Sequence, residues 1–188
     1  MNQVMRPYTE MTIEELRDLA AKAPKTPQER YDRAIEALQS ADSPYARWCA
    51  LGAAAKTSVE IGSDEEAAGY AHELRQLAPT YADDWNYGNA IQDFSVVFGL
   101  LSLRGGDAEA ARGHLLAAGR SPGSPQMVSF GPNMSLAKAL LEAGHHYAVL
   151  QYFDLCRSFW EMDRGQLDKW TDEVVRGLCP NFGANLIY

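Results

Sequence analysis

Signals for the start of a helix recur along the first part of the chain, and no segment shows the sustained apolar–polar alternation of a half-buried strand. "TIEE" at 12–15 and "SDEE" at 63–66 are capping boxes, in which a Ser or Thr caps the helix and a Glu returns the hydrogen bond. "TPQE" at 26–29 and "SPYA" at 43–46 place Pro at the first helical position, after a capping residue. These signals predict an all-α protein without a sheet.

Helical periodicity extends over most of the 188 residues, enough for one domain or one continuous repeat array. About nine helices are expected, at about 10–22, 27–40, 44–61, 64–77, 82–104, 108–119, 133–143, 146–162 and 166–177. Between them, the joint from Gly119 to Gly131 holds several Ser, Pro and Gly residues that forbid a continuous helix. We therefore predict a long non-helical connection there.

Glycines punctuate three turns between helices, at Gly62, Gly106 and Gly144, with spacings of 44 and 38 residues. Periods in this range are typical of stacked helical hairpins. A single domain is expected, because stacked hairpins share one continuous core. Its parts are N-terminal capping helices over 1–43, three repeat-like hairpins over 44–162, and a C-terminal helix and tail over 163–188.

The middle unit, "FGLLSLRGGDAEAARGHLLAAGRSPG" at 98–123, resembles a tetratricopeptide repeat. In that family, small residues lie where the two helices of a hairpin touch, and a proline closes the unit. The matching residues are the small Gly99, Ala111 and Ala118, the bulky Phe98 and Leu115, and the closing Pro122. The flanking units match less closely, because Leu74 and Val149 stand where small residues are usual.

The stretch from "PGSPQ" through "FGPNMSLAKALLEAG" to "FGANL" also resembles uncharacterised bacterial proteins of this repeat class, a resemblance that brings no function with it. The repeat resemblance implies an α-solenoid in which the first helix of each hairpin lines a concave groove. It further implies that the groove binds a protein or peptide partner, without catalytic activity of its own.

The net charge of −8 argues against nucleic acid or an anionic membrane as partner, since both demand clustered Lys and Arg. No apolar run approaches the length of a membrane span, and the first residues lack the apolar stretch of a signal peptide. Cys49, Cys156 and Cys179 are odd in number and form no CxxC pair. Reduced thiols in a cytoplasmic protein are expected.

No fingerprint of a hydrolase, a P-loop, a zinc protease or a dinucleotide-binding fold occurs in the chain. Glu142 with His145 or His146 has a spacing that places two metal ligands on one helical face, but Gly144 interrupts that helix. We therefore expect no catalytic residue, no metal and no cofactor. Enzymatic activity stays open as the less favoured reading.

The most unusual polar stretch is "DDWNYGNAIQDF" at 83–94. Within it, Asn86, Asn89 and Asp93 share one helical face, where a solvated helix would carry Lys, Glu and Arg. Two interpretations stay open. The amides form a hydrogen-bonding surface for a ligand, or they satisfy buried backbone groups of neighbouring loops.

Lys56 and Lys138 occupy matching places in the first and third units. In chaperone-binding members of the resembled family, groove Lys and Asn residues hold the terminal carboxylate of a peptide. Alternatively, both lysines extend to water. The candidate residues for binding a partner are Lys56, Trp85, Asn86, Asn89, Gln92, Asp93, Asn133 and Lys138. The alternative function is a small-molecule binder or enzyme that uses a polar pocket between residues 84–93 and 129–138.

"SFGPNM" at 129–134 has an echo in "NFGANL" at 181–186. The first copy is predicted to start a helix, with Phe130 as an apolar anchor and Asn133 as cap. The second copy leaves no room for a helix, so an extended, docked tail is expected. It docks near the first copy of its own chain or on a neighbouring subunit, which leaves a homodimer open.

Overall fold

The computed structural model describes residue 12 and residues 26–187, and over these residues the protein is helical, without a strand. The prediction of an all-α protein is confirmed. The α-helices are α2 (Pro27–Gln39), α3 (Pro44–Ile61), α4 (Asp64–Leu77), α5 (Tyr87–Arg104), α6 (Ala108–Gly119), α7 (Pro125–Phe130), α8 (Ser135–Glu142), α9 (His146–Cys156) and α10 (Gln166–Val175). The described residues also form two 3-10 helices, η2 (Ala78–Tyr81) and η3 (Gly183–Leu186). The helix expected at about 10–22 lies outside the described residues.

Local capping explains where several helices begin. Thr26 and Glu29 form the predicted capping box, with the Thr26 hydroxyl accepting from Glu29 N at 3.1 Å and Glu29 accepting from Thr26 N at 3.0 Å. Ser43 caps α3 by accepting from Ala46 N at 3.1 Å. The prediction of a capping box at 63–66 is wrong, because the Ser63 hydroxyl donates to the Glu66 side chain at 2.7 Å and caps no backbone N–H.

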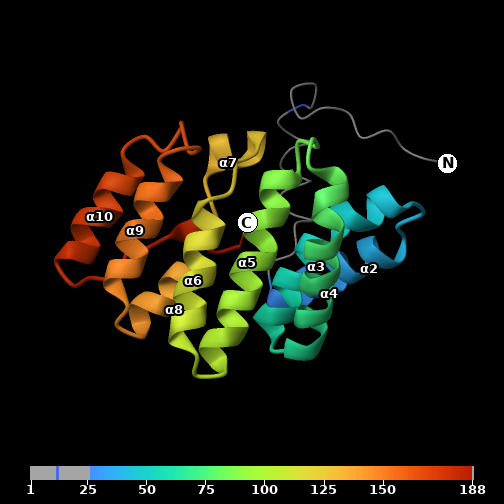
Figure 1. Ribbon diagram of the computed structural model, residues 1–188, viewed down its shortest axis with the longest axis horizontal. Helices are drawn as coiled ribbons and strands as arrows, with labels where there is room; N and C mark the ends of the chain where they lie inside the picture. The colour runs from blue at the N-terminus through green and yellow to red at the C-terminus, as the bar shows by residue number, and fades with distance from the viewer. Residues whose placement is uncertain (1–11, 13–25, 188) are drawn as a thin grey trace.

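The helices pack as a row of antiparallel hairpins, α3/α4, α5/α6 and α8/α9, with α2 at one end and α10 at the other (Figure 1). The first helices of the hairpins contact one another, α3 against α5 and α5 against α8. Gly62, Gly106 and Gly144 have φ of 84°, 83° and 86°, a left-handed conformation that glycine adopts without strain. These glycines therefore do mark the turns inside the hairpins.

The predicted long loop from Gly119 to Gly131 is wrong, since α7 occupies Pro125–Phe130. Ser124 caps α7 by accepting from Met127 N at 3.0 Å, and Pro125 occupies the first turn. The Ser-Pro pair thus starts a helix here as it does at Ser43. Figure 1 shows α7 beside one end of α5 and α6.

Some helices are shorter than predicted. Residues 82–86 form turns between η2 and α5, so α5 begins at Tyr87 rather than at about 82. The helix expected at 146–162 ends at Cys156. Beyond it, Phe159 and Trp160 turn back into the core, where both are buried.

The residues that carry the repeat resemblance lie in tight contacts between helices. Ala111, Leu115 and Ala118 on α6 are fully buried. A Cβ atom added to Gly99 on α5 would come within 2.2 Å of Leu136 Cδ2, so α5 and α8 approach closely at this glycine. Small residues therefore allow the hairpins to stack.

Ala111→Leu should lower the free energy of unfolding by about 1–3 kcal/mol, because it adds bulk to a filled helix contact. Gly113→Ala is the matched control on the same helix. No atom of the described residues lies within 4 Å of a Cβ there, so the helix should gain about 0.5–1 kcal/mol. Urea unfolding followed by circular dichroism measures both changes. An unchanged midpoint for Ala111→Leu would contradict the packing of α6.

The two Phe-Gly stretches lie against each other, so the tail docks on its own chain (Figure 1). Asn185 Nδ2 donates to Phe130 O at 2.9 Å and to Pro132 O at 3.0 Å, and Asn185 O accepts from Met134 N at 2.7 Å. Phe182 is buried, with its ring centroid 4.9 Å from that of Trp170.

Three details of the prediction for these stretches are wrong. The tail forms the 3-10 helix η3 instead of an extended strand-like segment. Phe130 is 57% exposed and so is no buried anchor, whereas residues 131–134, which follow it, are buried. Asn133 does not cap α8 as its N-cap residue, which is Met134; instead Asn133 Oδ1 accepts from Ser135 N at 2.9 Å.

Candidate functional site

Two adjoining hollows lie on the side of the array formed by α3, α5 and α8. The first, which we name the amide hollow, has a volume of about 300 Å³ and is lined by α3, α5, α7 and Leu74 of α4. The second, the tail hollow, has a volume of about 650 Å³ and is lined by α2, α3, α5, α8 and the tail. Ala53, Lys56 and Gln126 line both hollows, so the two are continuous.

The amide hollow takes its shape from the spacing of residues on α3 and α5. Trp48, Gly52 and Lys56 are four residues apart on α3 and therefore share one face. Asn89 and Asp93 face them from α5. Asn86, Asn89 and Asp93, which were predicted to share one face, all line this hollow.

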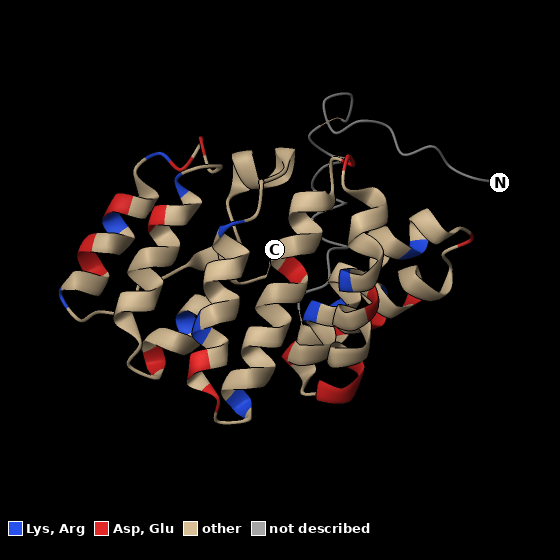
Figure 2. Cartoon of the chain, in the orientation of Figure 1, with Lys and Arg blue, Asp and Glu red and all other residues tan. Residues whose placement is uncertain are grey.

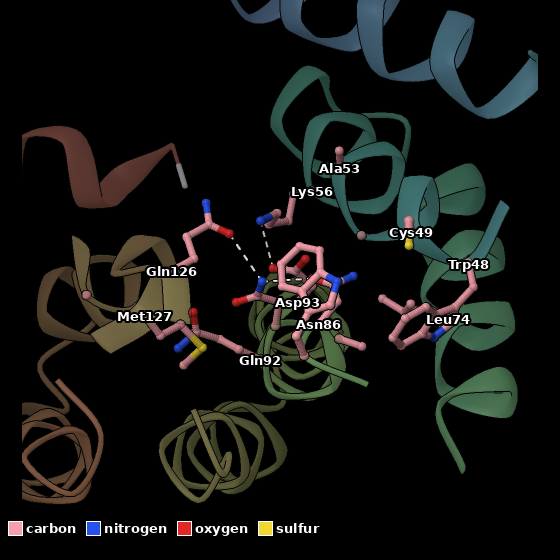
Figure 3. Close-up of a pocket in the computed structure, with 15 residues that line it drawn as sticks. Trp48, Cys49, Ala53, Lys56, Leu74, Asn86, Gln92, Asp93, Gln126 and Met127 are labelled. Carbon is pink, nitrogen blue, oxygen red and sulfur yellow. Dashed lines mark hydrogen bonds and ion pairs between the residues drawn. The ribbon is translucent and has the colours of Figure 1, made fainter. Parts of the chain in front are cut away.

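An ion pair joins these two faces, with Lys56 Nζ 2.7 Å from Asp93 Oδ1 (Figure 3). Gly52 makes room for it, because a Cβ there would come within 2.2 Å of Asp93 Oδ2. Burial raises the pKa of Asp93 above its ordinary value, and the Lys56 ammonium partly opposes this rise. Figure 2 shows how few charges α5 and α7 carry compared with α4 and α10.

Asn89 ties α5 to α7 beside this ion pair. Its Nδ2 donates to Asn86 Oδ1 at 2.8 Å and to Gln126 Oε1 at 3.2 Å. Its Oδ1 accepts from the Ser124 hydroxyl at 2.6 Å. The Asn89 side chain therefore has no spare proton, while the side-chain amide nitrogens of Asn86 and Gln126 donate to no described residue.

Gln92 has a structural role, although it also lines the amide hollow. It is buried, and its Oε1 accepts from Asn133 N at 2.9 Å. Its Nε2 donates to the Tyr152 hydroxyl at 3.3 Å, and that hydroxyl donates to Asn133 O at 3.0 Å. Of the two interpretations of the amide-rich stretch, Gln92 therefore fits the structural one, because it satisfies buried backbone groups of the loop before α8.

Aromatic rings form the rim and the floor of the amide hollow. Trp85 is 57% exposed at the rim. Trp48 is fully buried and stacks on Tyr81, with centroids 4.5 Å apart. The Trp48 Nε1 donor has no hydrogen-bond partner among the described residues, which is unusual for a buried polar atom. Cys49 lies nearby, and burial raises its pKa, which disfavours a reactive thiolate.

The tail hollow has cations on its walls, each paired with an acid. Lys138 pairs with Glu142 on the same helix, Arg30 of α2 with Glu60, and Arg104 of α5 with Asp64. Arg104 also donates to Val59 O at 2.7 Å. Apolar wall comes from Val96, Leu100, Leu186 and Ile187.

Each of the eight predicted binding residues lines at least one of the two hollows. Lys56 lines both, Asn133 and Lys138 line the tail hollow, and the others line the amide hollow. The alternative pocket expected between 84–93 and 129–138 corresponds to the amide hollow only in part. That hollow includes Gly131 and six residues between 85 and 93, but its opposite walls are α3 and α7.

Sequence reasoning did not select Trp48, Gly52, Leu74 or Gln126 as site residues, and Gln126 lies in the segment predicted as a non-helical connection. The Ser-Pro pair at 124–125 was the one local signal that could have placed Gln126 on a helix.

Within the described part of the chain, no three His, Cys, Asp or Glu side chains are grouped as metal ligands. His146 Nδ1 instead lies 3.1 Å from Gly144 O, at the turn between α8 and α9. None of the helices in residues 26–187 has both the length and the apolar character needed to cross a membrane.

Neither a family model, nor a curated protein, nor a solved structure matches the chain. The function must therefore be argued from the two hollows and the side chains that line them.

Proposed function

We propose that the protein is a tetratricopeptide-type helical array that binds an extended peptide segment of a partner protein along its two hollows. The stacked hairpins support this proposal, since their first helices lie side by side. α3 and α5 line both hollows, and α8 lines the tail hollow. In such an array, each added hairpin lengthens the inner surface, which suits an extended ligand.

The observation that carries the proposal is the continuity of the two hollows through Lys56 and Gln126. A peptide backbone needs donors and acceptors along its length, and side-chain amides supply both. Asn86 and Gln126 offer spare amide protons in the amide hollow, and the tail hollow adds apolar wall for side chains. Exposed Trp85 at the rim is the kind of aromatic anchor that dominates binding energy in interfaces.

Binding without chemistry fits the environments of the reactive groups in the described residues. Burial raises the pKa of Cys49 and, far more strongly, that of Cys156, so neither thiol is activated. The Asp93 carboxylate is held by Lys56 instead of being free to move a proton. A cytoplasmic location and a homodimer remain expectations of the sequence.

Trp85→Ala should weaken peptide binding at least about tenfold while leaving the melting temperature nearly unchanged, because the residue is exposed. Ligands are first selected from a random-peptide display library on the wild-type protein, and affinities are then measured by titration calorimetry. Tyr147→Ala is the matched control, since Tyr147 is 72% exposed on α9 and lines neither hollow. Equal affinities for the two variants, or no selected peptide, would overturn the proposal.

A further inference from the structure

The amide hollow offers both spare hydrogen-bond donors and spare acceptors. Asn86 Nδ2 and Gln126 Nε2 have no partner among the described residues. Lys56 has three ammonium protons, of which its pairing with Asp93 uses one. The main spare acceptor is Asp93 Oδ2, beside Gly52. A ligand group that suits this set accepts hydrogen bonds and can also donate one.

The charge of the hollow argues for an uncharged ligand. Lys56 and Asp93 neutralise each other, and their side chains are only 23% and 13% exposed. An anionic ligand would compete with Asp93 for Lys56, and a cationic ligand would compete with Lys56 for Asp93. Either would leave a partly buried charge without its partner, which is strongly unfavourable.

The apolar surface of the hollow suits an aromatic ring. Trp48, Leu74, Ala90 and Met127 form apolar wall, and the exposed indole of Trp85 stands at the rim. Aromatic rings pack favourably against an indole in stacked or edge-to-face geometry. The volume of about 300 Å³ lies at the lower end of small-ligand sites, so it holds a single ring system.

We propose that the amide hollow binds an uncharged aromatic ring that carries a hydroxyl group, the chemistry of a tyrosine side chain. The ring packs between Trp85 and the apolar wall, and the hydroxyl oxygen accepts from the spare donors while its proton is offered to Asp93. This inference deepens the proposed function, since it names the anchor residue of the bound peptide. A free phenolic compound shares the same chemistry.

The test uses p-cresol as the probe and the ¹H–¹⁵N spectrum of the full chain as the readout. The protein has four tryptophans, each with an indole N–H resonance. Saturable shifts of the Trp48 and Trp85 resonances are expected, without a shift of Trp170, which lies in the core around α9 and α10. Toluene, which lacks the hydroxyl, should bind about tenfold more weakly. 4-Methylbenzoate and 4-methylbenzylammonium should also bind more weakly than p-cresol.

A matched pair of variants locates the probe. Gln126→Ala removes a spare donor from an exposed position on α7, and should weaken p-cresol binding several-fold. Gln151→Ala removes the same group from an exposed position on α9 outside both hollows, and should leave binding unchanged. Equal binding of toluene and p-cresol, or equal effects of the two variants, would overturn the inference.

Peptides separate this inference from the proposed function. If a selected peptide loses about tenfold in affinity on Tyr→Phe replacement and competes with p-cresol, the ligand is a peptide tyrosine and both proposals stand. If selected peptides bind without regard to tyrosine, the inference fails and the proposed function survives. If p-cresol binds as described but no peptide does, the natural ligand is a free phenolic compound, and the peptide proposal fails.

Discussion

Gly131→Ala is expected to lower the free energy of unfolding by about 2–5 kcal/mol, the largest effect of any single substitution considered. Gly131 has φ of 85° and ψ of 178°, a combination that only glycine adopts freely, and forcing alanine into it costs about 1–3 kcal/mol. In addition, an alanine Cβ would come within 2.4 Å of Trp160 Cε2. Because Trp160 is buried against Trp170, it cannot move aside without disturbing the core.

Gly144→Ala separates the two causes. Gly144 also has a left-handed φ, of 86°, but within residues 26–187 nothing lies within 4 Å of an added Cβ. It should therefore show the backbone penalty alone, about 1 kcal/mol. Urea unfolding monitored by tryptophan fluorescence compares both variants with the wild type. Equal losses for Gly131→Ala and Gly144→Ala would contradict the close packing of Trp160 on the turn before α8.

Deletion of residues 181–188 should lower the free energy of unfolding by about 2–4 kcal/mol. The deletion exposes the surface that Phe182 covers on Trp170 and Phe153, and burial of one such ring contributes about 1.5–3 kcal/mol. It also removes the three hydrogen bonds between Asn185 and the 130–134 segment, worth about 1 kcal/mol each. The regained freedom of the tail offsets part of this loss.

Asn185→Ala is the graded control for the deletion. It removes the two side-chain bonds to Phe130 O and Pro132 O but leaves Phe182 in place, so its effect should be smaller, about 1–2 kcal/mol. Differential scanning calorimetry gives both values, and sedimentation checks that the oligomeric state is unchanged. A truncated protein that melts at the wild-type temperature would mean that the tail is free in solution.

Prediction from the sequence worked best where a helix is defined by its own residues. α3 and α6 lie at the predicted positions, because caps, glycines and periodicity are local properties. α7 was missed because Gly123 and the nearby prolines were given more weight than the capping Ser124. The tail was assigned to an extended form because a single 3-10 turn, stabilised by tertiary hydrogen bonds, has no periodicity to detect.

The candidate site was predictable only in its local part. The shared face of Asn86, Asn89 and Asp93 follows from helical spacing alone. The contact of Gly52 with Asp93 and the bonds of Gln92 to Tyr152 and Asn133 join helices distant in sequence. No local pattern encodes such contacts, so whether an amide faces a ligand or a buried backbone group could be decided only in three dimensions.

The hydrogen bonds between Asn185 and the segment before α8 affect the order in which the two halves of the molecule, α2–α6 and α8–α10, complete their folding. The helices from α2 to α6 contact their neighbours in sequence, so each hairpin can consolidate as soon as its own residues are available. The α8–α10 half reaches its full stability later, because the turn that introduces α8 is hydrogen-bonded to Asn185, more than fifty positions later. Until residue 185 has been synthesised, the apolar surface that the tail covers on this half stays exposed to solvent. This half is therefore the part of the nascent protein most prone to misassembly.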